Sequence, residues 1–396
     1  MVIKILWILV VVHIVITWVL AIRRGWRARQ RDQQQPVSSE VKDLPPVSVI
    51  VPAWNEKGTI ELCIKALQNL AYQKWEAIIL AGGDDGTFAA ASQAIGGDER
   101  FRLLERAPEP KNAALNRGVQ SAKYDIVVLL DCDNMVEPGW LAALIAPFTH
   151  GAAVSVGDSR PNRITWVTLE ERMWHILTYQ ILKLSWIQGD RSIAIRRELL
   201  ERIGGLPEHT YAREDWDIWV RLGETGERVV FAESASLTTD RPSTVGESWK
   251  HQVRWRRTHL NGMWEHRSTM LAQPAELFRQ LYGYLLSVGL AVMVFAALVV
   301  IILRPDWISS VLNLAAMMFV WLCVRQAAIA GSVAAFTGDW HWFVRAWMPA
   351  VNLFITSAAS LIALVTYHSL EPYYKGPRHT QPGCEERKTQ EYPDRI

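Results

Sequence analysis

Ile126-Val-Val-Leu-Leu130-Asp131-Cys-Asp133 is a run of five aliphatic residues that ends in two carboxylates. Runs of this length and composition are typical of strands buried on both faces of a sheet. Val47-Ser-Val-Ile-Val-Pro52 and Ala77-Ile-Ile-Leu-Ala81 are two further runs of this kind, and apolar residues at helical spacing, beginning at Ile60, lie between them. Strands that alternate with helices predict an α/β domain with a mainly parallel sheet covered on both faces.

Polar residues follow each of these three strands. Pro52-Ala-Trp-Asn55-Glu56 closes the first strand, and Gly82-Gly83-Asp84-Asp85-Gly86-Thr87 follows the second. Lys111 stands in the segment before the third strand, and Asp131 and Asp133 come directly after that strand. Parallel α/β sheets bind their ligands at the carboxyl ends of the strands. The residues that we expect around one such site are Pro52, Asn55, Glu56, Asp85, Lys111, Asp131 and Asp133.

The two aspartates after the third strand are the candidate metal ligands. Carboxylates two residues apart at a strand end can hold a hard divalent cation, Mg²⁺ or Mn²⁺, which takes its other ligands from water and phosphate oxygens. The ion would neutralise the charge on a leaving nucleotide diphosphate. An Asp-x-Asp pair alone arises in many proteins by chance, so the prediction depends on its place after a buried strand and among the other motifs.

Arg213-Glu214-Asp215-Trp-Asp217 supplies the candidate general base. A sugar hydroxyl is a poor nucleophile until a carboxylate takes its proton, and we assign that step to Asp215. The acidic cluster also suits a helix start, where carboxylates favour the positive end of the helix dipole. The two interpretations are compatible, because apolar residues at helical spacing follow the cluster.

Gln252, Arg254 and Trp255 form a further candidate group in a basic segment. An arginine can grip a phosphate through two parallel hydrogen bonds, and an indole can stack on the apolar face of a sugar ring. The alternative is a basic face that anionic lipids attract to the membrane surface. That alternative suits Arg256 and Arg257, which follow directly.

The chain of 396 residues concentrates its apolar residues near the N-terminus and in its last third. Residues 5–22 are long and apolar enough to cross a bilayer, and five arginines follow between positions 23 and 31. A signal peptide has its positive charge before the apolar core, so this segment is predicted to be an uncleaved anchor. Because such arginines remain in the cytoplasm, we expect the N-terminus outside and the following domain in the cytoplasm.

The last third contains further candidate spans at 281–303, from about 307, and from about 346 to 367. The middle one weakens around Arg325 and Gln326, so two or three crossings remain open, and with them the side on which the chain ends. Residues 260–280 mix apolar and polar residues, a pattern shared by helices in the membrane plane and by ordinary surface helices.

The predicted organisation follows from these boundaries. The formal net charge of +2 gives no indication of nucleic acid binding, and we expect no nucleic acid partner. The segments are an N-terminal anchor (1–22), a basic and polar linker (23–46), a cytoplasmic catalytic domain (47–258), an interfacial segment (259–280), a membrane region of two or three spans (281–368) and a polar tail (369–396).

Taken in order, these motifs resemble those of the membrane-bound family 2 glycosyltransferases, a group that includes cellulose, chitin and hyaluronan synthases and the ceramide glucosyltransferases. The resemblance covers residues 47–255 and the flanking spans. It implies a GT-A fold, a nucleoside diphosphate sugar donor, usually UDP-linked, and inversion at the anomeric carbon. In this sequence it implies that Pro52 to Glu56 border the uridine, that Asp131 and Asp133 bind the metal, that Asp215 is the base, and that Gln252, Arg254 and Trp255 belong to the Gln-x-x-Arg-Trp segment.

Two positions depart from the family pattern. Leu80 and Ala81 stand where an Asp-Asp pair often ends the second strand, although Asp85-Gly86-Thr87 matches the rest of that motif, so the nucleotide base stays open. His251 replaces the first glutamine of the last motif, which weakens any prediction of processive polymer synthesis. We predict an enzyme that transfers a sugar from a nucleotide diphosphate donor to a lipid or growing glycan acceptor. A processive synthase that secretes its product, and an inactive membrane relative, are the alternatives.

Overall fold

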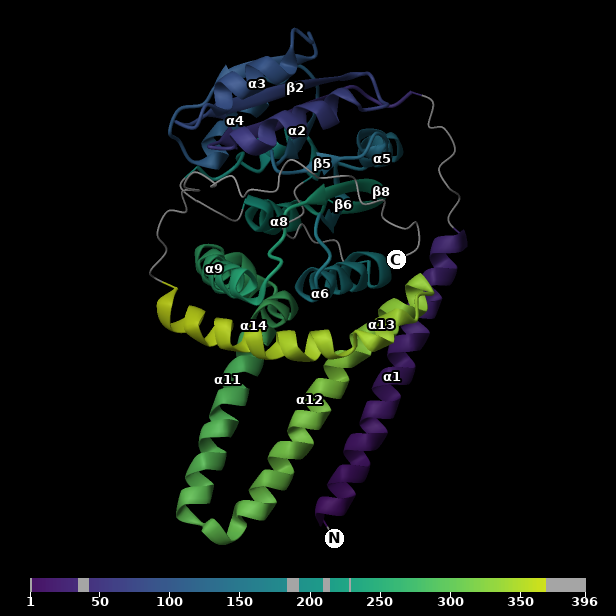
Figure 1. Ribbon diagram of the computed structural model, residues 1–396, viewed down its shortest axis with the longest axis vertical. Coiled ribbons are helices and arrows are strands. Elements are labelled where there is room, and N and C mark those ends of the chain that lie inside the picture. Colours follow the sequence, from purple (N-terminus) through teal and green to yellow (C-terminus); the bar gives the residue numbers. More distant parts are fainter. Residues whose placement is uncertain (1, 35–42, 184–191, 209–213, 228, 368–396) are drawn as a thin grey trace.

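The computed structural model describes residues 2–34, 43–183, 192–208, 214–227 and 229–367. An α/β domain occupies one end of the molecule, and three long helices run away from it at the other end (Figure 1). These helices are α1 (Val2–Gln34), α11 (Pro274–Leu303) and α12 (Ile308–Thr337).

One mixed sheet of eight strands forms the centre of the α/β domain, in the order β3-β2-β1-β4-β7-β6-β8-β5. Its first four strands are parallel, and they are β1 (Val47–Trp54), β2 (Trp75–Gly82), β3 (Phe101–Glu105) and β4 (Ile126–Leu130). The others are β5 (Met135–Val136), β6 (Val154–Pro161), β7 (Ser192–Arg196) and β8 (Val229–Thr239). Strand β7 runs antiparallel to β4 and β6, and β5 runs antiparallel to β8, whereas β6 and β8 are parallel.

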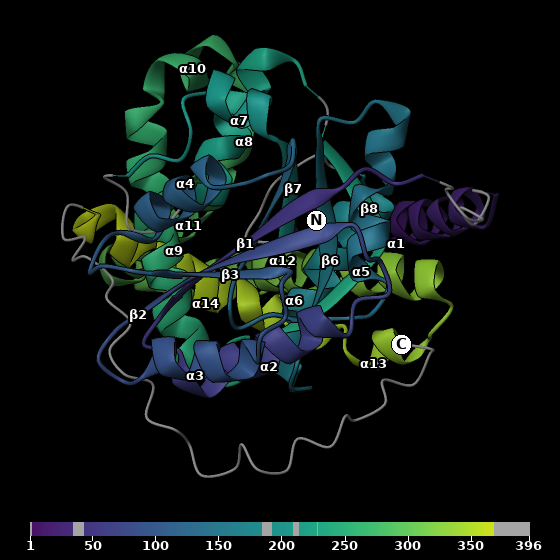
Figure 2. The same ribbon diagram turned by 90° about the horizontal axis from the view of Figure 1, so that it is seen from above.

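Helices cover both faces of the sheet, as the sequence predicts. They are α2 (Lys57–Gln68), α3 (Thr87–Ile95), α4 (Lys111–Gln120), α5 (Trp140–Ile145), α7 (Arg197–Arg202) and α8 (Glu214–Thr225). Successive residues of β1 point to opposite faces, so Val49 lies in one core with Ile60 of α2, while Ile50 lies in the other core with Leu115 of α4. Gly118 permits the close approach of α4, because a Cβ there would lie 2.4 Å from a methyl carbon of Ile50. Figure 2 shows α2 and α3 on one side of the strands and α4, α7 and α8 on the other.

Helices α1 and α12 pack side by side through small residues (Figure 1). A Cβ on Gly25 would lie 2.0 Å from the carbonyl oxygen of Ser332, and a Cβ on Gly331 would lie 2.9 Å from the ring of Trp18. The hydroxyl of Ser332 donates a hydrogen bond to the carbonyl of Ala21 at 3.0 Å. Small residues at helix interfaces let the backbones come together where lipid offers no hydrophobic driving force, so this contact is of the kind that membrane helices use.

Helix α14 (Trp347–Thr366) runs across the domain-side ends of α11 and α12 instead of alongside them (Figure 1). Helix α9 (Val245–Glu265) packs on it from the domain side: Nε of Arg257 donates to the hydroxyl of Thr366 at 2.9 Å, and Nδ2 of Asn261 donates to the carbonyl of Tyr367 at 3.1 Å. Among the described residues, α1, α11, α12 and α14 are long and apolar enough to span a membrane. In α14, 39% of the most apolar window is buried inside the protein, against 6% in each of the other three.

Shorter helices make up the remaining helical elements. They are η1 (Ala146–His150), α6 (Trp166–His175), η2 (Ile176–Ile181), α10 (Arg267–Ala272), η3 (Pro305–Trp307) and α13 (His341–Val344). Of these, η3 joins α11 to α12. The segment for which the sequence allows an in-plane or a surface helix, residues 260–280, forms the end of α9, all of α10 and the start of α11.

Candidate active site

The loops after β1 and β2 are fastened to each other by Asn55. Its backbone has a positive φ of 54°, its N–H donates to the carbonyl of Gly82 at 3.2 Å, and its Oδ1 accepts from the N–H of Asp84 at 3.0 Å. Gly83 leaves space for this amide, because a Cβ there would lie 2.1 Å from Oδ1 of Asn55. In the position that the sequence assigns to donor binding, Asn55 therefore also shapes the loop.

Asp85 lies at the joined starts of α2 and α3. Its carboxylate accepts the N–H of Lys57 at 3.0 Å and the N–H of Thr87 at 2.9 Å, and the hydroxyl of Thr87 accepts the N–H of Glu56 at 2.8 Å. Burial opposes ionisation of Asp85, but these hydrogen bonds outweigh it and lower the pKa of the carboxyl below its usual range. The carboxylate is thus anionic at neutral pH and holds two helix starts together.

Pro52 lies inside β1, where it is buried and opposite Leu80 of β2. The pairing of β1 with β4 ends at Ile50, so the missing N–H of Pro52 interrupts no ladder on that side. Pro52 therefore lies just beyond the point where β1 and β4 stop pairing, three residues before Asn55.

Asp131 and Asp133 follow β4, as the sequence predicts, and Lys111 joins them from the first residue of α4. Nζ of Lys111 lies 2.6 Å from Oδ1 of Asp131. The side chain of Asp131 is 25% exposed, whereas Asp133 is buried. The structure therefore brings together Lys111 and the Asp-x-Asp pair, which lie far apart along the chain, with one carboxylate open to a ligand.

The buried thiol of Cys63 lies close enough to three carboxylates for their negative charges to affect its pKa. Burial, together with the charges of Asp133, Asp131 and Glu56, raises the pKa of this thiol to about 12. Glu56 is buried, and its Oε2 accepts the hydroxyl of Thr59 at 2.8 Å. Three carboxylates from the ends of β1 and β4 thus converge on one region.

These carboxylates fit a divalent cation by the chemistry of their oxygens. No group of three or more His, Cys, Asp or Glu residues with metal-binding geometry occurs among the described residues. An ion held by Asp131 and Asp133 would take its other oxygens from outside the protein, which is the usual arrangement for Mg²⁺ bound with a phosphorylated substrate.

Arg106, directly after β3, is a site residue that sequence reasoning missed. Its guanidinium lies 5.6 Å from the ring centroid of Trp54 at the end of β1, and its Nη2 donates to the carbonyl of Glu109 at 3.1 Å. Burial lowers the pKa of Arg106. Recognising it requires knowing that residues 101–105 form the strand next to β2, and their mixed polarity conceals that strand.

Two asparagines of α4 connect the Lys111 region to the chain that leads into α8. Nδ2 of Asn112 donates to the carbonyl of Pro207 at 2.8 Å. Asn116 exchanges two hydrogen bonds with the backbone of Leu206, at 2.8 and 2.9 Å. One helix thus carries Lys111 at its start and holds the segment that precedes the proposed base.

Asp215 is the second residue of α8, so the acidic cluster starts a helix, as its composition also suggests. The structure describes Glu214 and Asp215 by their backbone alone, and Arg213 lies outside the described residues. The side chain of Asp215 therefore stays a predicted base.

Gln252, Arg254 and Trp255 lie on α9, and all three are partly buried. Thr244 caps this helix together with Glu247, and the rings of His251 and Trp255 lie 5.2 Å apart. Helix α9, which carries these residues, lies between the α/β domain and α14 (Figure 1).

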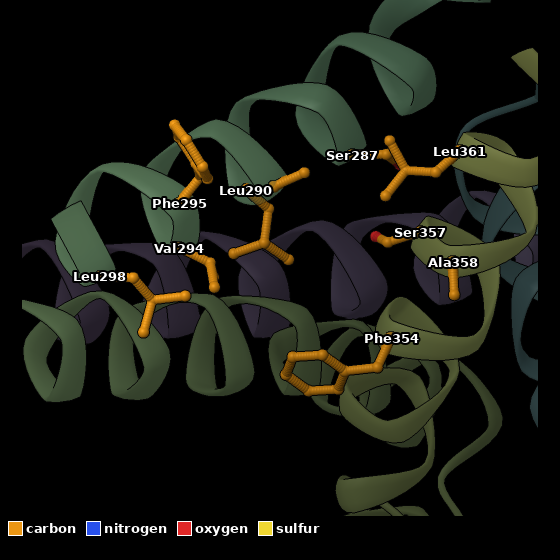
Figure 3. A pocket seen from close by; sticks show the side chains of 10 residues that line it. Ser287, Leu290, Val294, Phe295, Leu298, Phe354, Ser357, Ala358 and Leu361 are labelled. Atoms are coloured by element: carbon orange, nitrogen blue, oxygen red, sulfur yellow. The ribbon is translucent and has the colours of Figure 1, made fainter. Parts of the chain in front are cut away.

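A separate cavity of about 460 Å³ lies between α11 and α14, and Figure 3 shows its lining. Leu290, Phe295 and Phe354 are among the side chains that surround it. None of the candidate catalytic residues lines this cavity, so the candidate active site is a different place.

Known proteins resemble this chain in sequence and in fold. The family model described as Glycosyl transferase family 2 matches residues 48–204. The chain is 27% identical over 237 residues to a probable glycosyltransferase, YdaM, of Bacillus subtilis, a match that covers 55% of this chain and 56% of that one. It is 24% identical over 227 residues to the poly-beta-1,6-N-acetyl-D-glucosamine synthase of Staphylococcus aureus, covering 54% of this chain and 55% of that one. The chain thus matches about half the length of these curated relatives.

A solved structure resembles nearly the whole molecule. The mannosyltransferase PcManGT from Pyrobaculum calidifontis, in complex with GDP-Man and Mn²⁺, superposes with a TM-score of 0.55 at 19% identity, covering 93% of this chain and 99% of that one. This likeness establishes the fold as GT-A. Residues 48–204 thus form a glycosyl transferase family 2 domain, within a chain that has a GT-A fold and four helices apolar enough to span a membrane.

Proposed function

We propose that this protein transfers a sugar from a nucleotide diphosphate sugar to a lipid or growing glycan acceptor at a membrane, by metal-assisted inverting displacement. The observation that carries the proposal is the convergence of Glu56, Asp131 and Asp133, with Lys111 paired to Asp131, at the strand ends of a GT-A sheet. We expect a UDP-sugar from the motif at Pro52 to Glu56. A GDP-sugar is the competing donor, because the structural neighbour binds GDP-Man.

On the donor side, Asp131 and Asp133 would hold the Mg²⁺ or Mn²⁺. When bound, the ion supplies positive charge that stabilises the departing diphosphate. Lys111 lies within contact of Asp131 and adds a second cation beside the same phosphates. The loop that Asn55 and Asp85 hold in place then borders the nucleoside.

On the acceptor side, Asp215 takes the proton from the attacking hydroxyl. A single base implies direct displacement, so the product is inverted and no sugar becomes attached to the enzyme. Arg254 would grip a phosphate, and Trp255 would stack on a sugar ring. Both lie on the helix that packs on α14, which suits an acceptor presented at the membrane.

The proposed orientation follows from the arginines after the first span. They keep the α/β domain in the cytoplasm and the N-terminus outside. Helices α1, α11 and α12 then cross the membrane, and α14 lies along its cytoplasmic surface, a placement supported by its crosswise path and greater burial. The proposal contains two C-terminal crossings.

The decisive experiment incubates the detergent-purified protein with a panel of UDP-, GDP- and other nucleotide sugars and measures released nucleoside diphosphate. Turnover with none of them, with candidate lipid acceptors present, would refute the proposal. Asp215→Asn then tests the base: turnover should fall by about two to four orders of magnitude while donor binding, measured by calorimetry, is kept. If donor binding is lost together with turnover, Asp215 belongs to the donor site or to the fold.

A processive synthase is the second candidate, favoured by the similarity to a poly-beta-1,6-N-acetyl-D-glucosamine synthase. Mass spectrometry of the product separates the two. One added sugar per acceptor supports single transfer, and a ladder of products formed from one binding event supports the processive alternative.

A further inference from the structure

Asp217 is a buried carboxylate two residues beyond the proposed base, and only 4% of its surface is exposed. Nε2 of His266 lies 2.7 Å from its Oδ1, and Nε of Arg221 lies 2.7 Å from its Oδ2. Burial opposes its ionisation, but the hydrogen bond from His266 and the charge of Arg221 hold its pKa below the usual range. Asp217 is therefore an anion with a partner on each oxygen.

The two partners come from different parts of the fold. Arg221 lies one turn further along α8, and its Nη1 donates to the carbonyl of Ile203 at the end of α7. His266 follows the last residue of α9, where its N–H donates to the carbonyl of Gly262 at 3.0 Å. The carboxylate of Asp217 thus joins the first turn of α8 to the ends of α7 and α9.

The buried side chain of Ile218 and the ring contacts of Trp216 with His259 and His266 also hold the start of α8, but the junction has unfilled space beside it. A cavity of about 330 Å³ borders it, lined by Gly204, Pro207, Asp217, Arg221, Glu265 and His266. The start of α8 therefore has space beside it into which it can shift. The contacts of Asp217 with His266 and Arg221 oppose such a shift.

We propose that His266, through Asp217, positions Asp215 for proton transfer by fastening the first turn of α8 to α9. This inference rests on the proposed function, because it takes Asp215 as the base. Asp215 and Asp217 share one helical turn, so a shift of one displaces the other, and misplacing a catalytic group by about 1 Å can cost about 100-fold in rate. His266 itself does not touch the reacting atoms and is a positioning residue.

The same bond ties the base to the helix that carries Trp255. Helix α9 begins near Thr244, presents Trp255 in its middle and ends at the His266 junction. The position of the base Asp215 is therefore fixed relative to that of Trp255. Helix α9 is itself held on α14 by Arg257 and Asn261.

The test uses His266→Leu in the full chain, purified in detergent. Arg221 still neutralises Asp217 in this variant, so no unpaired buried charge is left behind. We expect kcat to fall about 10- to 100-fold, with the donor dissociation constant and donor KM unchanged. His266→Gln, which keeps an N–H donor at similar reach, should restore most of the rate. His150→Leu, an exposed histidine distant in sequence, is the matched control.

A double-mutant cycle with Asp215→Asn separates positioning from a merely structural role. Once the base is gone its placement no longer matters, so His266→Leu should cause no further loss in that background. Independent, additive losses would overturn the inference, as would unchanged kcat or failure of His266→Gln to rescue. If His266→Leu does not fold, His266→Asn, with an amide too short to reach Asp217, takes its place. If Asp215→Asn alone retains full turnover, Asp215 is not the base. That result refutes the proposed base, whereas additive losses in the cycle refute only the positioning role of His266.

Discussion

Nζ of Lys111 lies 2.6 Å from Oδ1 of Asp131, so a cation and an anion that both face the proposed donor phosphates neutralise each other. Under the proposed function, a metal ion held by Asp131 would compete with Lys111 for this carboxylate, and Lys111 would then be available to a phosphate oxygen. The ion pair therefore keeps Lys111 and Asp131 in position at the partly exposed end of β4, where neither charge is left without a partner.

Lys111→Met should weaken donor binding more than it slows transfer. A hydrogen bond to a charged group contributes about 1.5–3 kcal/mol, so we expect the donor KM to rise roughly 10- to 100-fold. Lys111→Arg should lose less, because it keeps the charge. Titration calorimetry with the donor measures the effect, and Lys65→Met, on the exposed side of α2, is the control. An unchanged donor KM would contradict a phosphate contact.

Asp131→Asn and Asp133→Asn should each lower turnover by about two orders of magnitude or more, because charge on the departing diphosphate is then less well stabilised. Chelator should do the same to the wild type, and Mn²⁺ or Mg²⁺ should restore it. Asp125→Asn is the matched control, because this carboxylate directly precedes β4 and its side chain is 92% exposed. Full activity in excess chelator excludes the metal role.

Trp255→Ala should reduce transfer to the acceptor more than hydrolysis of the donor by water. The reason is its place on α9, beside Arg254 and next to the ring of His251. Both rates are measured on one preparation by released diphosphate and by labelled product. Trp264→Ala, on the same helix but 67% exposed, should leave both rates unchanged. Equal losses in both reactions of Trp255→Ala would indicate a structural indole.

Glu170 of α6 should make the protein less stable as the pH rises. Burial raises the pKa of this carboxyl from 4.5 to about 8, although hydrogen bonds with Asn352 and Trp174 act in the opposite direction. Between these values the folded state binds more protons than the unfolded state, so the free energy of unfolding falls as the pH increases. Glu170→Gln mimics the protonated acid and should flatten this dependence. Thermal unfolding between pH 5 and 9, values chosen to span that window, measures it, and a parallel decline in the variant contradicts the assignment.

Three of the four parallel strands could be predicted because aliphatic residues dominate 47–52, 77–81 and 126–130. Strand β3 escaped prediction because Arg102 and Glu105 interrupt a short apolar pattern at the edge of the sheet. The antiparallel half depends on pairings such as β4 with β7, and local patterns carry no information about such long-range partners.

The candidate site was predictable where its residues directly follow strands, as Asp131 and Asp133 do. The roles of Asn116 and Arg106 could not be predicted. Both side chains donate to backbone carbonyls, and no side-chain pattern in the sequence indicates such partners. His266 was missed for a similar reason: its partner Asp217 lies 49 positions away. The path of α14 is equally hidden, because a helix lying on a membrane and one crossing it can share the same apolar composition.

The crosswise position of α14 has a kinetic consequence. It lies between α9 and the domain-side ends of α11 and α12, and in the proposed orientation it keeps the α/β domain close to the bilayer. Under the proposed function with a lipid acceptor, that acceptor would reach the enzyme by lateral diffusion in two dimensions. Its mole fraction among the surrounding lipids, and not its concentration in the whole sample, sets the rate of encounter, so diluting the acceptor with inert detergent or lipid slows transfer while the bulk concentration stays the same.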